Sequence, residues 1–409
     1  MIGFELTPEQ ERVKQLGREL AEEFSRRAGQ HDEERSLPVE NFEKIREAGL
    51  FGIALPEDLG GLGVGMIGWT AFAEELAQGD ASTALAFNMH GNATGGIAQR
   101  PAIPADVKER VAKLAVEEGK LMCTSVSEPT SSSLLPATYN PTVQADEVDG
   151  GWRLYGRKLF ASMFEASDYC YLYVHPRENP NPGAALGVLV ETKQDGIAVT
   201  DLWDTIGMRA TRSNQVDYDG AFVADELVLY ETENFVESFI IQEANWSFGG
   251  YTACYLGVGL GMVEWARKQL ASRKGKGYAQ PMGYATENSL RLGQMVAELE
   301  AARLMVYRAA WQSDTQPPSP DTFNWWVRAK LAVGNAVQRA VQLALPATGL
   351  HALFRIEGFE RMVRDSLTAP IMSPNSDACA MMVGLLTMGL DPMQAPSIKM
   401  EQPPVAVPA

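Results

Sequence analysis

The sequence predicts an α+β protein in which a middle antiparallel β domain, barrel-like in its strand pattern, separates two helical domains. Apolar residues recur at helical spacing over residues 1–120 and again over 233–391, where the pattern indicates a four-helix bundle. Aromatic and β-branched residues become frequent in 121–232, with turn signals about every 8–12 residues. The strands follow one another directly, which is typical of an antiparallel sheet and not of alternating β–α units. A proline-rich tail fills 392–409.

Composition and charge narrow the function classes. The 409 residues are 45% hydrophobic and 21% charged, the balance of a globular chain with a large core. The formal net charge of −17 disfavours binding to nucleic acids or to anionic membranes. No apolar run is long enough to span a bilayer, and no signal peptide stands out. The four cysteines form no CxxC pair and the four histidines no metal-ligand pattern, so we expect a soluble, metal-free protein of the reducing cytoplasm.

The N-terminal domain opens with a well-marked helix. Thr7 is a good N-cap, Pro8 suits the first turn and Gln10 completes a capping box. The glycine-rich run Gly60–Gly65 resembles a phosphate-binding loop, but it follows a helix and not the strand that a dinucleotide fingerprint requires. We therefore interpret it as a turn between helices. Further helices are expected at 38–48, 65–79, 82–100 and 104–118.

Turn residues separate the candidate strands of the β domain, as at Asp149-Gly150-Gly151, Asp195-Gly196 and Asp219-Gly220. The expected strands are 152–159, 169–174, 185–191, 197–202, 215–218 and 227–230. The expected C-terminal helices are 242–274, 286–313, 323–348 and 377–386. A β domain between two helical domains creates a cleft where the three meet, and we expect the ligand there.

Two segments carry hydroxyl groups near this expected cleft. The segment Cys123–Ser133 is dense in Ser and Thr, whose hydroxyls suit the polar edge of a flat heteroaromatic ring or a phosphate. Taken alone, it could equally be an ordinary serine-rich loop. One strand later, Phe160 could pack on such a ring, and Ser162 could donate a hydrogen bond to it.

Seven short motifs, in matching order and spacing, resemble those of the acyl-CoA dehydrogenases. They are Leu55-Pro56-Glu57 with Gly60-Gly61, Asp80–Leu85, Ser127-Glu128-Pro129, Gly156–Ser162, Gly207-Met208-Arg209, Gly257 with its helix to Arg273, and Arg364-Asp365. The resemblance extends over residues 5–390, and the motifs in register are far more specific than any one alone. It implies the α–β–α fold and bound FAD.

The resemblance also implies which residues contact FAD. Val126 and Ser127 correspond to flavin contacts that precede Glu-Pro, and Phe160-Ala161-Ser162 replaces the family's Trp-x-Thr over the flavin. Arg273 stands where an arginine reaches the FAD pyrophosphate of a neighbouring subunit. Gly349 is what remains of the family's Gln-x-x-Gly-Gly element for the adenosine half. The expected cofactor contacts are Val126, Ser127, Phe160, Ser162, Arg273, Gly349, Asn375 and Asp377.

Dehydrogenation of an acyl thioester needs a carboxylate that removes the α-proton. Counting from Arg364-Asp365, the place of the family's usual catalytic Glu is taken by Ser373, which cannot act as that base unaided. Some relatives carry the Glu on the long helix after the β domain, at a place that falls near Trp246. Glu243, one turn earlier on the same helix face, is our expected base, and the alternative is an exposed Glu at a helix start. Asp377 is a second candidate, as a base, a helix cap or an FAD contact.

Substrate recognition departs from the family pattern. Ser133 holds the place of the serine that helps to bind CoA, and Trp246 is the second expected substrate contact. The family's arginine near Phe248 is absent. The acyl group could therefore arrive on CoA or on a carrier protein.

Three functions remain open. The first is FAD-dependent dehydrogenation of an acyl-CoA or related acyl thioester, with electron-transfer flavoprotein as the electron acceptor. The second is a flavin-dependent monooxygenase on the same fold, which needs no α-carbon base and so fits Ser373. The third is a non-catalytic subunit of a heteromeric acyl-CoA dehydrogenase. Arg273 acting across subunits requires at least a dimer, and the resemblance implies a homotetramer.

Overall fold

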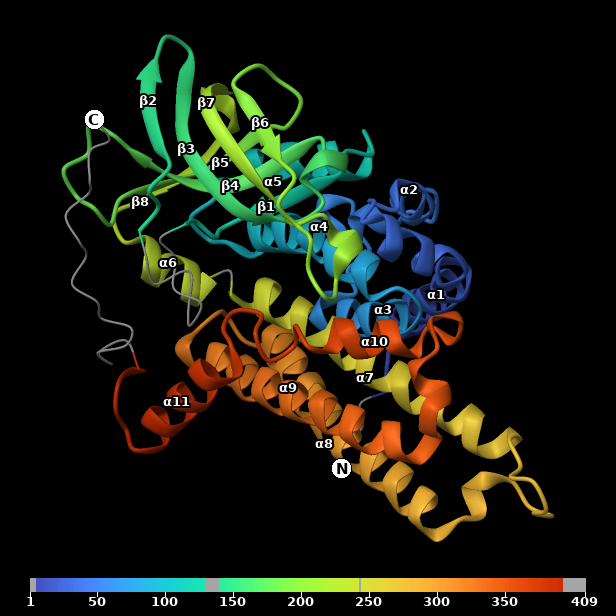
Figure 1. Cartoon of the computed structure of the whole chain (residues 1–409). Coiled ribbons are helices and arrows are strands. Elements are labelled where there is room, and N and C mark those ends of the chain that lie inside the picture. Colours follow the sequence, from blue (N-terminus) through green and yellow to red (C-terminus); the bar gives the residue numbers. More distant parts are fainter. Residues whose placement is uncertain (1–4, 130–139, 243, 393–409) are drawn as a thin grey trace.

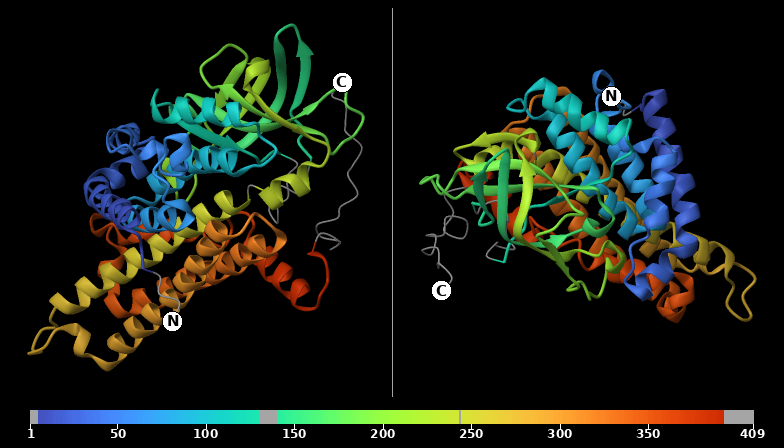
Figure 2. Two further views of the ribbon diagram at one scale, coloured as in Figure 1. Left: turned by 180° about the vertical axis from the view of Figure 1, so that it is seen from behind. Right: turned by 90° about the horizontal axis from the view of Figure 1, so that it is seen from above.

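The computed structural model describes residues 5–129, 140–242 and 244–392, which form three parts along the chain (Figure 1). N-terminal helices, a β domain and C-terminal helices follow one another, so the predicted fold class is confirmed. In Figure 1 the β domain lies above the long helices of the C-terminal part. The views in Figure 2, from behind and from above, show that the two helical parts pack side by side.

The N-terminal part begins at the predicted capping box. The Thr7 hydroxyl accepts from the Gln10 N–H at 3.2 Å, and the Gln10 side chain accepts from the Thr7 N–H at 3.0 Å. The glycine-rich run is a turn between helices, as predicted, and Gly60 takes a φ of +76° there. The helices are α1 (Pro8–Glu34), α2 (Val39–Glu47), α3 (Gly65–Gly79), α4 (Ala81–Gln99) and α5 (Ala105–Val116).

The β domain is a single sheet. Its strands are β1 (Met122–Ser125), β2 (Gln144–Val148), β3 (Gly151–Ala161), β4 (Tyr169–Pro176), β5 (Ala185–Glu191), β6 (Ile197–Thr200), β7 (Asn214–Ala224) and β8 (Val228–Thr232). Within the described residues the order is β6-β7-β3-β2-β4-β5-β8, with β1 beside β4. The pairs β1–β4 and β2–β4 are parallel and the others antiparallel. The sequence pattern missed β1 and β2, and with them the parallel pairs.

The turn predicted at Asp219-Gly220 is wrong, because both residues lie inside β7. Leu154 of β3 pairs with Ala221, while its neighbour Tyr155 pairs with Asp219, so Gly220 is an extra residue in the ladder. Its φ of +83° is a conformation that glycine adopts without strain. The turn signal therefore marks a β-bulge within one long strand.

The C-terminal part is a helical bundle with additional short helices. Its helices are α6 (Phe235–Gln242), α7 (Ala244–Ser272), α8 (Thr286–Thr315), α9 (Pro320–Thr348), α10 (Phe359–Ser366) and α11 (Ser376–Thr387). The helices α7, α8 and α9 pack on one another, and α11 packs on α9. The sequence pattern predicted helical structure from residue 233 on, which includes α6, but it did not separate α6 as a helix and it missed α10. In the described part of the chain, no helix is both long enough and apolar enough to cross a membrane.

The two helical parts are joined through α3. The fully buried Glu74 carboxylate accepts hydrogen bonds from Arg303 at 2.5 Å and from the Tyr307 hydroxyl at 2.9 Å, both on α8. Asp314, at the end of α8, accepts from the first N–H groups of α3, where the helix dipole favours a negative charge. A Cβ at Gly257 of α7 would lie 2.4 Å from the Glu74 carbonyl oxygen, so these helices touch through their backbones.

All three parts meet at Arg364 of α10. Its guanidinium contacts both carboxylate oxygens of Asp32 on α1, at 2.6 and 2.9 Å, and also bonds Glu360 one turn earlier. It donates to the carbonyl oxygen of Ile206, in the loop between β6 and β7, at 3.1 Å. The hydrogen bonds to Asp32 raise the pKa of Arg364, so the guanidinium stays charged.

The next residue, Asp365, holds the same loop of the β domain. Its buried carboxylate accepts the Met208 N–H at 2.6 Å, and burial raises the pKa of Asp365 to about 7. A Cβ at Gly207 would lie 2.2 Å from the Arg364 carbonyl oxygen, so the loop fits against α10 only with glycine there. Arg209 extends the junction by donating to the Asp32 carbonyl oxygen at 2.8 Å.

His90 of α4 anchors β1 beneath the sheet. It is fully buried, and its Nε2 lies 2.8 Å from the Phe51 carbonyl oxygen while its Nδ1 accepts the Met122 N–H at 3.1 Å. Burial lowers the pKa of His90 to about 4. Both nitrogens are used by a neutral imidazole that donates to Phe51, so the ring is a structural link and not a free acid or base.

We expect Arg364→Met to lower the free energy of unfolding by about 3 kcal/mol, because Asp32 and Glu360 lose their partner in a largely buried setting. Chemical denaturation of the purified variant measures the loss. The matched control is Arg267→Met, which removes an exposed ion pair with Glu264 that water screens, so it should leave the free energy of unfolding nearly unchanged. Equal losses in the two variants would contradict the assigned role of the junction.

In His90→Gln the free energy of unfolding should fall less steeply than in the wild type as the pH is lowered from 6.5 to about 4. Between pH 6.5 and about 4 the unfolded chain protonates this histidine while the folded chain keeps it neutral, so stability falls as the pH falls through that window. The slope lost in the variant approaches about 1.4 kcal/mol per pH unit. Unfolding at pH 7, 5.5 and 4.5 measures it, and the substitution of an exposed histidine, His351→Gln, is the matched control. An unchanged slope in His90→Gln would show that burial does not hold this imidazole neutral.

Candidate functional site

The structure brings the two hydroxyl-bearing segments together at the end of β1. Ser127 lies two residues beyond β1, and its carbonyl oxygen accepts the Leu159 N–H of β3 at 2.8 Å. Phe160 follows with a φ of +58°, a left-handed conformation that is uncommon for a large side chain. Phe160 is 53% exposed. Val126, Ser127 and Phe160 therefore lie close together, and we call these three residues the first group.

A buried ion pair fixes these segments to each other. Lys158 and Glu128 are almost fully buried, and Nζ lies 2.5 Å from Oε1. The second carboxylate oxygen of Glu128 accepts the Thr142 N–H at 2.7 Å and also contacts the Thr142 hydroxyl. A buried ion pair holds its position well only when further hydrogen bonds satisfy it, as they do here. The ion pair therefore holds the segment of Ser127 in a fixed position relative to the segment of Phe160.

A chain of hydroxyls backs the site. The Ser162 hydroxyl lies 2.7 Å from that of Ser213, which lies 2.7 Å from that of Thr211. Beside them, the Trp203 ring meets Phe160 edge to face at 5.9 Å. The sequence pattern missed Trp203, Thr211 and Ser213, because they join the site only through the pairing of β3 with β7 and the loop that precedes β7.

Arg273 and Gly349 form a second group. The Arg273 guanidinium donates to the carbonyl oxygen of Thr348, directly before Gly349, at 3.4 Å. Gly349 takes a φ of +70° where α9 ends. Two motifs that lie 75 residues apart therefore meet at one turn.

The second group lies far from the first within one chain. Asn92 of α4 donates to Thr124 of β1 at 3.2 Å, and Gly95 of the same helix touches Trp246, so β1 lies near the first turns of α7. Arg273 follows the last residue of α7, a helix of 29 residues and about 44 Å. The two groups of predicted residues therefore lie near opposite ends of α7.

The remaining predicted residues have separate places. Asn375 is the N-cap of α11, where its side chain accepts the Ala378 N–H at 2.8 Å, so Asn375 and not Asp377 caps this helix. Asp377 lies in the first turn of α11. Trp246 is buried between α4 and α3, with its ring 6.2 Å from that of Trp69. Glu243 and Ser133 lie outside the described residues.

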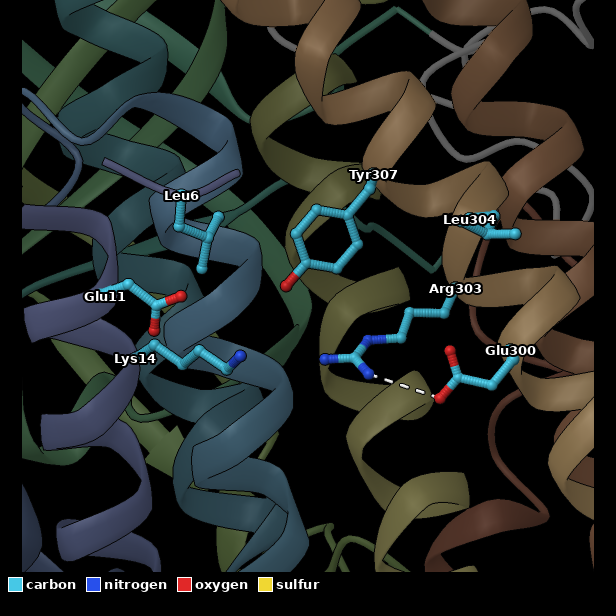
Figure 3. Close-up of a pocket in the computed structure, with 7 residues that line it drawn as sticks. All are labelled: Leu6, Glu11, Lys14, Glu300, Arg303, Leu304 and Tyr307. Atoms are coloured by element: carbon cyan, nitrogen blue, oxygen red, sulfur yellow. Dashed lines mark hydrogen bonds and ion pairs between the residues drawn. The ribbon is translucent and has the colours of Figure 1, made fainter. Parts of the chain in front are cut away.

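A pocket of about 220 Å³ lies elsewhere, between the N-terminal segment and α8 (Figure 3). Its lining residues are Leu6, Glu11, Lys14, Glu300, Arg303, Leu304 and Tyr307. In Figure 3 Tyr307 and Arg303 project from α8 toward the N-terminal helices. Both bond the buried Glu74, so this pocket borders the contact between helical parts and contains none of the predicted site residues. Across the described residues, no cluster of three or more His, Cys, Asp or Glu could hold a metal ion.

Three domain models of one protein family match this chain. Acyl-CoA dehydrogenase models match the N-terminal domain at residues 7–101, the middle domain at 123–221 and the C-terminal domain at 245–384. Benzylmalonyl-CoA dehydrogenase of Aromatoleum aromaticum is 28% identical over 321 residues, 78% of this chain and 82% of its own. Dibenzothiophene monooxygenase of Mycolicibacterium goodii is 25% identical over 384 residues, 88% of this chain and 90% of its own.

Solved structures share the fold. The glutaryl-coenzyme A dehydrogenase–glutaryl-CoA complex superimposes with a TM-score of 0.84 at 22% identity, over 96% of this chain and 98% of that one. FMN-bound TdsC from Paenibacillus sp. A11-2 gives a TM-score of 0.83 at 22% identity, over 92% and 97%. Because all three domain models match in chain order and the fold agrees, this chain belongs to the acyl-CoA dehydrogenase family.

Proposed function

We propose that this chain is a flavin-dependent oxidoreductase that uses FAD to introduce an α,β double bond into an acyl-CoA or a related acyl thioester. The observation that carries the proposal is the assembly of Ser127 and Phe160 into one site by the buried Glu128–Lys158 pair. These are the segments that the family resemblance assigns to the flavin. A relative with a dehydrogenase name, benzylmalonyl-CoA dehydrogenase, supports this chemistry.

The residues of the first group fit a flavin ring. Phe160 offers an exposed apolar face on a fixed backbone, and Val126 and Ser127 are partly exposed beside it. The hydroxyl chain behind them can donate in either direction, so Ser162 can present a donor or a lone pair to a polar ring edge. When bound, the flavin accepts a hydride equivalent from the β-carbon of the substrate.

Arg273 and Gly349 complete the cofactor site of a second copy in this proposal. Their distance from the first group supports the assignment, as do the exposed apolar residues beside Gly349. Leu350 is 77% exposed and Ile356 is 94% exposed, and a large exposed apolar surface favours a partner. The Arg273 guanidinium would face the pyrophosphate and the turn at Gly349 the adenosine half. Asn375 and Asp377 remain proposed cofactor contacts.

Glu243 remains the proposed base. Ser373 has a buried hydroxyl with no hydrogen-bond partner among the described residues, and a serine cannot remove the α-proton alone. Several buried carboxylates already have partners: Glu74 with Arg303, Asp80 with Thr83 and Asn41, Glu128 with Lys158, and Asp365 with Met208. Electron-transfer flavoprotein is the proposed acceptor, and Ser133 and Trp246 are the proposed substrate contacts.

Ser373 favours one alternative, a flavin-dependent monooxygenase, which requires no α-carbon base. Dibenzothiophene monooxygenase is a relative of similar coverage and supports it. Such an enzyme would take reduced flavin and oxygen in place of an electron-transfer flavoprotein.

Anaerobic titration of the purified flavoprotein with a panel of acyl-CoAs tests the proposal. We expect at least one acyl-CoA to bleach the flavin absorption band, and Glu243→Gln to slow bleaching by at least about a thousandfold, since proton removal would lack its base. The matched control is Glu237→Gln on α6, where the exposed carboxylate should not matter. If no thioester bleaches the flavin but the protein consumes oxygen with an added flavin reductase, the monooxygenase alternative holds.

A mixed-oligomer experiment tests the position of Arg273. Phe160→Asp and Arg273→Gln should each abolish tight FAD binding in a homo-oligomer, by damaging the ring face and the pyrophosphate contact. In a 1:1 mixed dimer, one of two sites combines an intact ring face with an intact Arg273. We expect FAD occupancy near half of wild type after co-purification with two affinity tags. If Arg273 served the site of its own chain, no mixed site would be intact and the mixture would stay colourless.

A further inference from the structure

Buried polar groups without partners gather where α3, α4 and α7 meet. Among the described residues, the Trp69 indole nitrogen, both amide atoms of Asn88 and the Ser247 hydroxyl are buried and make no hydrogen bond. We call these three residues the polar cluster. Native interiors pair nearly all such groups, so a cluster of unpaired ones needs an explanation.

Glycines bring the three helices of the polar cluster into contact. A Cβ at Gly250 of α7 would lie 1.5 Å from the Asn88 amide oxygen, so Asn88 of α4 rests on the α7 backbone. Trp69 of α3 covers Gly91, one turn after Asn88 on the same face of α4. Ser247 lies one turn before Gly250 on α7, next to Trp246. The members of the polar cluster thus surround one junction.

Polar groups connect this junction with the proposed flavin site. Asn92, one turn beyond Asn88 on α4, donates to Thr124 of β1 at 3.2 Å. The next strand residue, Ser125, has a buried hydroxyl without a partner in the described structure, and Ser127 follows two residues later. Hydrogen-bonding groups therefore continue from Ser127 to Asn88. A substrate that reacts at the flavin could extend its far end along this line.

We infer that the polar cluster binds the far end of the substrate, and that this end carries a neutral group that both donates and accepts hydrogen bonds, such as a carboxamide. This inference rests on the proposed function and names its substrate class. Asn88 supplies one acceptor and two donor hydrogens, Ser247 supplies either, and Trp69 supplies a donor, which complements an amide or hydroxyl. Among the described residues that make these contacts, Trp69, Asn88, Gly91, Trp246 and Gly250 are all uncharged, so they offer no counter-charge to a carboxylate or an ammonium group. A plain hydrocarbon chain would leave the cluster unpaired.

Isosteric ligand pairs test this inference on the purified holoprotein. One pair is the pantetheine thioester of 5-amino-5-oxopentanoic acid and that of 5-methylhexanoic acid, which differ only by an amide in place of an isopropyl group. The second pair, phenylacetamide and isobutylbenzene, makes the same exchange without a thioester. We expect calorimetry to show at least about tenfold tighter binding of the amide in at least one pair. Asn88→Leu should remove that preference.

Stability separates a ligand site from a structural role. Asn88→Leu should raise the melting temperature of the ligand-free protein, because leucine removes two unpaired polar atoms. The matched control is Asn41→Leu, another fully buried asparagine, whose amide bonds Arg27, Asp80 and Thr83 and whose loss should lower the melting temperature.

The inference is overturned if neither amide binds more tightly than its isostere, or if Asn88→Leu destabilises the protein as Asn41→Leu does. Ordered waters that pair the cluster, together with equal binding within each pair, would also overturn it. If only the proposed function fails, phenylacetamide still binds in preference to isobutylbenzene, and no acyl thioester bleaches the flavin.

Discussion

The ion pair between Arg364 and Asp32, with two hydrogen bonds, is the contact on which the relative placement of the three parts depends. One guanidinium holds α1, its own helix α10 and the loop that leads into β7. Asp365 holds the same loop through the Met208 N–H, so adjacent residues attach the β domain to both helical parts. Charged groups in a largely buried setting are costly to leave unpaired, so these contacts favour the observed arrangement of the three parts. The hydroxyl chain begins within that loop, at Thr211, whose hydroxyl lies 2.9 Å from the Met208 carbonyl oxygen.

A second buried ion pair, between Glu128 and Lys158, holds two segments together at the candidate site in the same way. Glu128 and Lys158 join the end of β1 to β3, and the uncommon backbone conformation of Phe160 follows directly after that link. The positive φ has a cost that the surrounding contacts must offset, and such conformations are frequent at functional sites. The fold thus places a partly exposed aromatic residue and a hydroxyl chain where β3 ends and β7 begins. Arg273 and Gly349 lie at the other end of α7, a helix about 44 Å long, which supports the proposal that two copies form the complete cofactor site.

Local signals in the sequence predicted those features that local chemistry decides. The Thr7–Gln10 capping box, the turn at Gly60 and the long periodic helices depend on neighbouring residues, and they were predicted correctly. The short strand β1 pairs in parallel with β4, which is distant in sequence, and no local pattern shows such pairing. The strand β2 forms a hairpin with β3, but it is mostly exposed or half-buried and carries polar residues, so its own sequence lacks the pattern of a strand. The sequence pattern predicted a turn at Gly220 where the structure has a β-bulge, because glycine after aspartate suits a turn and a bulge equally well. Family motifs predicted the meeting of Ser127 with Phe160, whereas Trp203 and the polar cluster depend on tertiary contacts alone.

The visible absorption spectrum of the gently purified protein, with the released cofactor identified by chromatography, tests the central claim most directly. The claim is that two partial sites on one chain combine into complete FAD sites in an oligomer. It predicts a yellow oligomer that contains about one FAD per chain and loses FAD when it dissociates into single chains. A colourless protein that takes up no added FAD, or a monomer that retains FAD with Arg273 replaced, would contradict the claim.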